Sequence, residues 1–453
     1  MTPNSFAYIV FLVIGALIYH PLSQKAKKPF LLLLSIWFYA IGGVKFLPLL
    51  ALTVTFNFFA AQKLERTERK RGLLTLVLVL NLGSLGLFKY LGFFGELLGC
   101  TGVQLSLPQL ALPIGISFYT FVICGYMIDV YRGREAERNF LDFALFTTFF
   151  PAILSGPIER SKSLLPQIKQ PRRATADDVR FAAERLIEGT VKKVLLADNL
   201  AVLVNTAYAD PAQFSGLELA FAAVAYALQI YCDFSAYSDM AIGSARLFGI
   251  TLMENFHAPY MAQSSKEFWH RWHISLSTWF RDYVYIPLGG NRCSPARHIF
   301  NLLAVWTLTG FWHGANWTFM AWGLYFGVLL ILEKKFLAGW IARLPSVLQH
   351  LYALFFIVIG WVFFRSDSMG LAVQYLGSMF TSTVPLNRFV IEYLLRFWPY
   401  LLFGVVLSAP VFPRLKSTRI WRVLEFPVLA VLFTLCLMRL LASSYNPFIY
   451  FRF

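Results

Sequence analysis

The residues best suited to chemistry are two histidines in aromatic, apolar surroundings. His313 lies in the run Leu308–Gly323, and His273 lies in the run Glu267–Gly290. Histidine has an unperturbed pKa close to neutral pH, so it can take up and release protons as a general base. An ionisable group between membrane-embedded flanks is costly unless it faces a polar cavity or a partner. We therefore predict a functional site at His313, the alternative being a core histidine hydrogen-bonded between helices.

The region around His273 concentrates polar and charged side chains, among them Arg271 and Arg281. On one helix, His273 and Ser277 would share a face at i,i+4 spacing, with His270 one turn before His273. This combination favours a site, although the individual tryptophans also fit an interfacial belt and the arginines can extend to headgroups. No HExxH pattern occurs and no cysteine or acidic residue completes a zinc set, so we predict no metal. The region also lacks a G-x-S-x-G nucleophile elbow.

The composition predicts that these residues sit in a membrane protein. The chain has 453 residues, of which 58% are hydrophobic and only 14% are charged, whereas soluble domains carry about 25% charged residues. We expect an all-α polytopic fold forming a single integral membrane domain over residues 1–453, surrounded by membrane lipids. The formal net charge is +16, but Lys and Arg punctuate the apolar segments. They therefore fix topology and do not predict a nucleic-acid partner.

The apolar segments predict about a dozen transmembrane and re-entrant helices. Their basic loops are expected on the cytoplasmic side, which puts the N-terminus and the tail 443–453 outside. The segment Phe143–Ile158 is interrupted by prolines and reads as re-entrant, and residues 256–297 read as interfacial and re-entrant helices. The other expected helices are Phe6–His20, Phe30–Ile41, Phe46–Ala61, Leu73–Leu87, Leu110–Val130, Val179–Val204, Leu217–Leu247, Ile299–Trp312, Trp317–Leu332, Leu351–Phe364, Leu394–Leu407 and Phe426–Leu441.

Several motifs resemble those of the membrane-bound O-acyltransferase (MBOAT) family. The stretches around His273 and His313 resemble its two signature regions, and they read RWHISLSTWFRDY and GFWHGANWTFMAWG. Further stretches are similar to the bacterial branch typified by alginate O-acetyltransferase membrane subunits: LPIGISFYTF, IDVYRG, FFPAILSGPIER, KKVLLADNLA, DFSAYSDMAIG and the ending PFIYFRF. One departure is His270, where the family pattern leads us to expect an arginine.

The resemblance implies helices around a central funnel or tunnel, and transfer of an acyl group, most often acetyl, from a cytoplasmic thioester to a hydroxyl. It implies acetyl-CoA as the donor and no bound cofactor. His313 would be the general base, with His273 orienting or supporting it. The remaining candidates are the possible contacts of the coenzyme A phosphates (Arg271, Arg281, Lys192 and Lys193) and other substrate-binding residues (Trp312, Asn316 and Ser277). The alternative for the cations is topology anchoring.

The C-terminal tail supplies a candidate acyl acceptor, Tyr450, in the aromatic strip Phe448–Phe453. A phenol has a pKa of about 10, far below that of a sugar hydroxyl, so its ester is a good acyl donor. The hypothesis is that Tyr450 carries the acetyl group to a separate periplasmic, SGNH-type esterase-like partner. That partner would acetylate alginate, another exopolysaccharide or peptidoglycan outside the inner (cytoplasmic) membrane of a bacterium. The alternative for Tyr450 is an interfacial anchor.

Two other functions stay open at the level of sequence. A polytopic transporter or flippase of an anionic or lipid-linked substrate would also need many spans, a polar cavity and broken helices. The sequence shows no inverted repeat of the kind found in transporters, and transport does not explain the motif pair around His273 and His313. A non-catalytic assembly scaffold is the third possibility.

Overall fold

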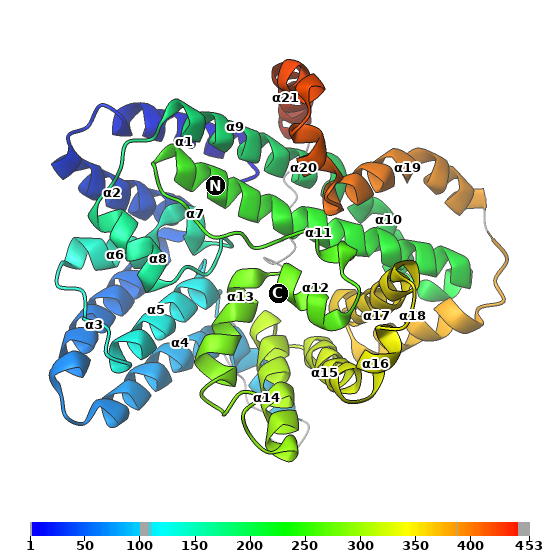
Figure 1. Cartoon of the computed structure of the whole chain (residues 1–453), viewed down its shortest axis with the longest axis horizontal. Helices are drawn as coiled ribbons and strands as arrows, with labels where there is room; N and C mark the ends of the chain where they lie inside the picture. The colour runs from blue at the N-terminus through cyan, green and yellow to red at the C-terminus, as the bar shows by residue number, and fades with distance from the viewer. Residues whose placement is uncertain (1, 100–107, 109, 387, 443–453) are drawn as a thin grey trace. The chain divides into compact units, whose positions relative to one another are not determined.

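The chain folds into helices throughout the part that the structure describes. The computed structural model describes residues 2–99, 108, 110–386 and 388–442, and every regular element in these ranges is helical (Figure 1). Five helical segments are long and apolar enough to cross a membrane: Gln24–Arg66, Lys70–Gly99, Gly216–Leu247, Ser346–Arg365 and Val423–Ala442. The prediction of an all-α membrane fold is confirmed.

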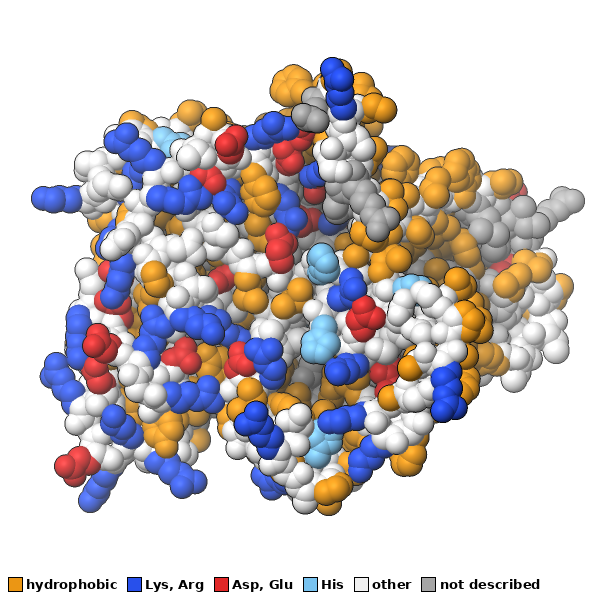
Figure 2. Space-filling view, in the orientation of Figure 1, with side chains coloured by type: hydrophobic (Ala, Val, Ile, Leu, Met, Phe, Trp, Pro, Cys, Tyr) orange, Lys and Arg blue, Asp and Glu red, His pale blue; other side chains and the backbone are white. Residues whose placement is uncertain are grey.

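Large apolar side chains are exposed on several of these helices. Phe426 is 83% exposed and Leu441 is 72% exposed on α21 (Arg419–Ala442), and Leu395 is 70% exposed on α19 (Arg388–Ser408). The space-filling view shows exposed hydrophobic side chains where Figure 1 places both helices (Figure 2). Exposed apolar surface on this scale marks a contact with membrane or partner, and it fits the membrane setting.

Contacts divide the chain into two compact units. The first comprises residues 1–186 and 237–254, and the second comprises residues 187–236 and 255–453. Helix α11 (Gly216–Leu247) contributes residues to both units. That residues 1–453 form one membrane domain stays a prediction.

The first unit is built mainly from its N-terminal helices. Helix α2 packs against α6, and α4 packs against α3 and α5. Between α3 and α4, the buried amides of Asn57 and Asn81 donate to each other's oxygens at 2.9 Å in both directions. The helices are α1 (Phe6–Tyr19), α2 (Gln24–Gly43), α3 (Leu47–Arg66), α4 (Lys70–Gly99), α5 (Ile116–Tyr131), α6 (Phe140–Thr148), α7 (Phe150–Ile153), α8 (Ser161–Lys169) and α9 (Ala176–Thr190).

Two segments of the first unit test the expected boundaries. The predicted span Leu73–Leu87 is too short, because α4 continues to Gly99. Lys89 and Glu96 interrupt the hydropathy, but apolar residues still recur every three or four positions, which is the helical period. The predicted interruption of Phe143–Ile158 is confirmed, since α6 ends at Thr148 and Pro151 lies in the first turn of α7, where proline is tolerated.

The second unit contains the helices that carry both histidines of interest. Between α9 and α21 its elements are η2 (Val191–Ala197), α10 (Asp198–Ala209), η3 (Pro211–Gln213), α11, η4 (Pro259–Met261), α12 (Ser265–Arg271), α13 (Ile274–Phe280), η5 (Arg281–Tyr285), α14 (Pro295–His313), α15 (Trp317–Leu332), η6 (Glu333–Leu337), α16 (Ala338–Ile341), α17 (Ser346–Arg365), α18 (Met369–Thr381), α19 and α20 (Val411–Lys416). Helix α18 was not predicted, because its polar residues lower the hydropathy. It docks through the buried Tyr375, whose hydroxyl donates to the Leu219 carbonyl at 2.7 Å.

Helices α14 and α15 form a close hairpin whose approach depends on glycine. A Cβ atom added at Gly310 would lie 2.3 Å from the Phe319 carbonyl oxygen. A Cβ atom added at Gly323 would lie 2.4 Å from the Trp306 carbonyl oxygen. Both positions therefore require glycine, because a larger residue would push the two backbones apart.

Candidate functional site

The helical conformation of the chain is interrupted at His273, between α12 and α13. His273 has φ 44° and ψ 55°, a left-handed conformation that is uncommon for a residue other than glycine. Asn255 stabilises this interruption of the helix. Its carbonyl accepts the Ile274 N–H at 3.0 Å, and its side-chain oxygen accepts the Ser275 N–H at 3.1 Å. The prediction of one helix carrying His270, His273 and Ser277 is therefore wrong. A backbone bond from the Ser277 N–H to the His273 carbonyl, at 3.0 Å, still joins these two residues.

The His273 imidazole is buried and unsatisfied. It is 2% exposed, and the Phe234 ring meets it edge-on with the centroids 4.6 Å apart. Neither ring nitrogen has a hydrogen-bond partner within the described part of the chain. Burial lowers the pKa of His273 to about 3, so the ring is neutral near pH 7. A neutral imidazole offers one donor and one acceptor, and leaving both unused when buried is costly.

His313 is the last residue of α14 and is enclosed by aromatic rings. It is 4% exposed, and its ring centroid lies 5.0 Å from Trp312, 5.0 Å from Trp322 and 5.2 Å from Phe364. Helix α14 ends there because Gly314 is extended, with φ −175°. The Trp312 ring also lies 6.0 Å from the His273 ring, so this indole packs beside both histidines.

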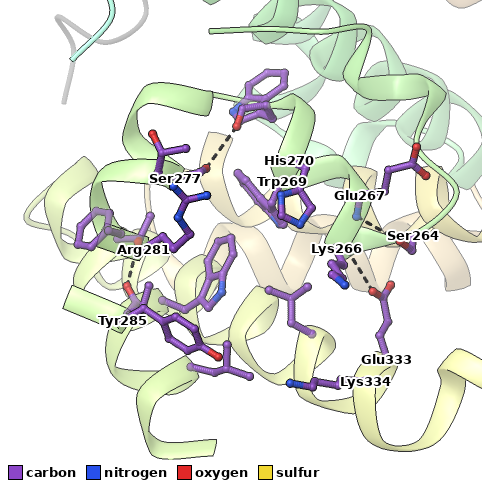
Figure 3. Close-up of a pocket in the computed structure, with 18 of the residues that line it drawn as sticks. Ser264, Lys266, Glu267, Trp269, His270, Ser277, Arg281, Tyr285, Glu333 and Lys334 are labelled. Carbon is purple, nitrogen blue, oxygen red and sulfur yellow. Dashed lines mark hydrogen bonds between the residues drawn. The ribbon is translucent and has the colours of Figure 1, made fainter. Parts of the chain in front are cut away.

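Both histidines line one pocket of about 860 Å³ in the second unit. Its buried part also includes the indoles of Trp269, Trp272 and Trp306. At the exposed part, Lys266, His270, Arg281 and Lys334 are reached by solvent. In the close-up, His270 and Trp269 lie between Arg281 on one side and Lys266 and Lys334 on the other (Figure 3).

The exposed part of the pocket is electropositive. Lys266, Arg281 and Lys334 line it. The carboxylate of Glu267 is engaged elsewhere, since its Oε1 lies 2.7 Å from Nη2 of Arg271. Burial, together with the positive charges of Lys266 and Arg281, lowers the pKa of His270. Such a mouth favours an anionic ligand.

Of the remaining predicted site residues, some line the pocket and others lie outside its lining. Arg281 lines the pocket with its Nε 2.8 Å from Oδ1 of Asp282, and Ser277 lines it with its hydroxyl 3.4 Å from the Trp272 carbonyl. Arg271 lies outside the pocket lining, as do Trp312 and Asn316. Asn316 caps α15, its side-chain oxygen accepting the Thr318 N–H at 3.1 Å. Tyr450 lies outside the described residues.

Lys192 and Lys193 lie on η2, away from the pocket lining. The Lys193 ammonium is buried, 2.7 Å from Oδ1 of Asp233 and 2.9 Å from Oδ1 of Asp198. The Lys192 ammonium lies 5.6 Å from the centre of the Tyr231 ring. The structure thus gives both lysines partners within the protein.

Sequence reasoning missed several polar residues of the pocket wall, among them Lys266, His298, Glu333 and Lys334. Nζ of Lys334 lies 3.0 Å from Nε2 of His298. In the sequence, the charged triplet Glu333, Lys334 and Lys335 only follows an apolar segment, and nothing in its spacing indicates that it faces His298. Within the described ranges, no group of three or more His, Cys, Asp or Glu side chains is placed to hold a metal ion.

The carboxylate of Glu333 holds the start of α12. Glu333 is 4% exposed, and its two oxygens accept the backbone N–H groups of Ser265 at 2.8 Å and Lys266 at 3.1 Å. We predict that Glu333→Ala lowers the free energy of unfolding by about 2 kcal/mol, because two backbone donors at the start of α12, one of them buried, lose their acceptor. Glu333→Gln should lose less, since its amide keeps one acceptor oxygen. Thermal unfolding in detergent measures the change in stability. The control is Asp367→Ala, at an 84% exposed side chain. Equal losses of stability in Glu333→Ala and in this control would refute the capping role.

Comparison of the sequence with known protein families identifies the family of this chain. Residues 31–366 match the model of the membrane-bound O-acyltransferase family. The chain belongs to the MBOAT family. This O-acyltransferase is therefore an enzyme and a multi-pass membrane protein, and both His273 and His313 lie within the matched residues.

Curated relatives cover most of this O-acyltransferase. It is 36% identical to the "probable alginate O-acetylase AlgI" of Pseudomonas putida over 99% of both chains. It is 40% identical to the protein of the same name from Pseudomonas aeruginosa, over 83% of this chain and 74% of the relative. A peptidoglycan O-acetyltransferase of Helicobacter pylori is 36% identical over 82% of this chain and 77% of the relative.

Proposed function

We propose that the protein takes an acetyl group from cytoplasmic acetyl-CoA and passes it across the bacterial inner membrane for O-acetylation of an extracytoplasmic polysaccharide. The relatives named above act on alginate or peptidoglycan by their names, so alginate, another exopolysaccharide or peptidoglycan is the polymer class. The observation that carries the proposal is the shared pocket, in which two buried histidines lie behind a cationic mouth.

The donor fits the pocket by charge and by size. Coenzyme A carries phosphates, and Lys266, Arg281 and Lys334 present positive charge where the pocket is exposed. The volume of about 860 Å³ lies within the range of about 300–1,000 Å³ typical of small-molecule sites. Lys192 and Lys193 were expected to bind the same phosphates, but their partners on the protein favour the cations of the mouth for this role.

His313 acts as the general base in this proposal. Its imidazole takes the proton of the acceptor hydroxyl while that oxygen attacks the thioester carbonyl. The new C–O bond forms, the C–S bond breaks, and the leaving thiolate takes the proton back from the imidazolium. The acetyl group is thereby exchanged for a proton, with no other reactant.

His273 supports the same step without changing charge. Its pKa of about 3 keeps the ring neutral, so its N–H can donate to the thioester carbonyl oxygen as negative charge develops there. The two nitrogens without protein partners and the strained backbone are consistent with a residue held for a ligand.

Tyr450 is the proposed acyl carrier on the outer side, and an SGNH-type periplasmic partner would receive the acetyl group from it. Purified protein incubated with acetyl-CoA labelled in the acetyl group should acquire the label, and Tyr450→Phe should abolish the labelling because the phenol oxygen is gone. Tyr445→Phe, a second tyrosine in the tail, is the matched control and should label normally. Labelling of Tyr450→Phe at the wild-type level would exclude the carrier role.

The same incubation tests the function as a whole. An acyltransferase releases free CoA in proportion to the label that it transfers. A transporter or flippase would release no free CoA and acquire no label, and that result would overturn the proposed function.

A further inference from the structure

A second pocket, of about 580 Å³, lies in the first unit between the start of α2, the start of α6 and the end of α8. Its polar lining consists of three lysines and three carboxamides: Lys25, Lys28, Lys169, Gln24, Asn139 and Gln170. Gln24 joins α2 to the segment that follows α8, because its Nε2 donates to the Pro171 carbonyl at 3.0 Å. Asn139 uses its side-chain oxygen to cap α6, accepting the Leu141 N–H at 2.9 Å, which leaves its NH₂ group as a donor.

Positive charge exceeds negative charge around this pocket. Lys28 lies 2.9 Å from Oδ1 of Asp142, and Lys169 lies 2.8 Å from Oε2 of Glu137. Lys25 lines the pocket as an exposed side chain, and no ion pair is found for it among the described residues. The pocket lining therefore keeps a net positive charge after its two ion pairs are formed.

A fourth lysine, Lys27, sits on the same turn of α2, outside the pocket lining. Its side chain is fully buried, and its ammonium has no hydrogen-bond partner in the described ranges. It lies 4.8 Å from the centre of the Tyr19 ring. A buried ammonium is costly unless an anion balances it, and the nearby carboxylate of Asp142 is already engaged by Lys28.

Apolar surface on the same helix indicates what kind of anion fits. Helix α2 belongs to the segment Gln24–Arg66, which is long and apolar enough to cross a membrane. Further along α2, Leu33 is 64% exposed and Trp37 is 54% exposed. Lys and Arg side chains are numerous where Figure 1 places α2, α6 and α8 (Figure 2). A lipid joins a phosphate to acyl chains, so it matches both surfaces at once.

We propose that this pocket binds the phosphodiester headgroup of an anionic membrane lipid. The lysines attract the phosphate, the free carboxamide groups donate to its oxygens, and the acyl chains lie along the exposed side of α2. Basic pockets at the ends of membrane helices have this chemistry. The site is separate from the histidine pocket and does not depend on the reaction proposed there.

Native mass spectrometry of the full-length protein in detergent tests the proposal. Offered equal amounts of phosphatidylglycerol and phosphatidylcholine, the wild-type protein should retain the anionic lipid. Lys25→Gln should weaken that retention by about fivefold, and Lys25→Glu by about thirtyfold, as one or two charges are removed. Lys25 is exposed, so neither substitution disturbs the fold.

The matched control is Lys45→Gln, at an exposed lysine in η1 (Val44–Phe46) beyond the opposite end of α2. It should retain phosphatidylglycerol as the wild type does. Equal retention of both lipids by the wild type, or equal losses in Lys25→Gln and Lys45→Gln, would overturn the proposal. Displacement of the lipid by millimolar inorganic phosphate would also overturn it, because the pocket would then select a free phosphate.

Discussion

Replacing His313 with alanine is expected to lower kcat for acetyl transfer by about a hundredfold to ten-thousandfold, the usual contribution of a positioned general base. The imidazole lies at the buried part of the pocket, 4% exposed, so water cannot easily take its place. KM for acetyl-CoA should change little, because the cations proposed to bind the donor lie at the exposed mouth. Release of CoA by the purified protein, with the proposed acetyl-accepting partner present so that the enzyme turns over, measures both constants.

A second variant separates this chemical role from a packing role. His313→Gln keeps a polar side chain of similar size but cannot act as a base near neutral pH. It should therefore unfold at nearly the wild-type temperature and still lose transfer. Wild-type kcat in a folded His313→Gln protein would contradict the general-base role and favour a core histidine.

Removing the carboxylate of Asp233 is expected to have the largest effect on stability. Asp233→Ala should lower the free energy of unfolding by about 3 kcal/mol, because it takes away one of the two carboxylates that balance the buried Lys193 ammonium. Asp233 also precedes Phe234, whose ring packs against His273 at 4.6 Å. Transfer activity should therefore fall together with stability. Chemical unfolding in detergent measures the first effect, and CoA release measures the second.

Two further variants make this prediction specific to a buried charge. The pair Lys193→Met with Asp233→Leu removes both charges and should recover much of the lost stability. Asp367→Ala removes an 84% exposed carboxylate from its pair with Arg365, at 3.5 Å, and should cost less than about 1 kcal/mol. If the double variant is no more stable than Asp233→Ala, an unbalanced lysine is not the cause of the loss.

Local signals were sufficient to predict the hairpin that carries His313. The expected helix Trp317–Leu332 coincides with α15, and the expected end of the preceding helix at Trp312 is one residue from the end of α14. Asn316 is a favourable N-cap residue. A helix can be predicted from sequence where an apolar run follows such a residue. The family motif around His313 lies within the same short stretch.

Features that depend on distant residues could not be predicted in this way. The left-handed backbone at His273 depends on Asn255, which binds the following two residues from another segment. The role of Glu333 depends on contact with the N-terminus of α12, far from it in sequence. The sequence marks both as polar residues in apolar surroundings, but only tertiary contacts decide which face a pocket, cap a helix or neutralise a buried charge.

The contact between Gly310 and Gly323 has a consequence for how fast ligands enter and leave. His313 ends α14, whose backbone already touches that of α15, so moving it requires separating the two helices. Exposed side chains such as Lys266, His270 and Lys334 change rotamers in picoseconds to nanoseconds and meet no comparable barrier. The inner end of the pocket is therefore rigid and selects ligands by its fixed shape. The entrance is flexible and sets the rate at which donor and product exchange.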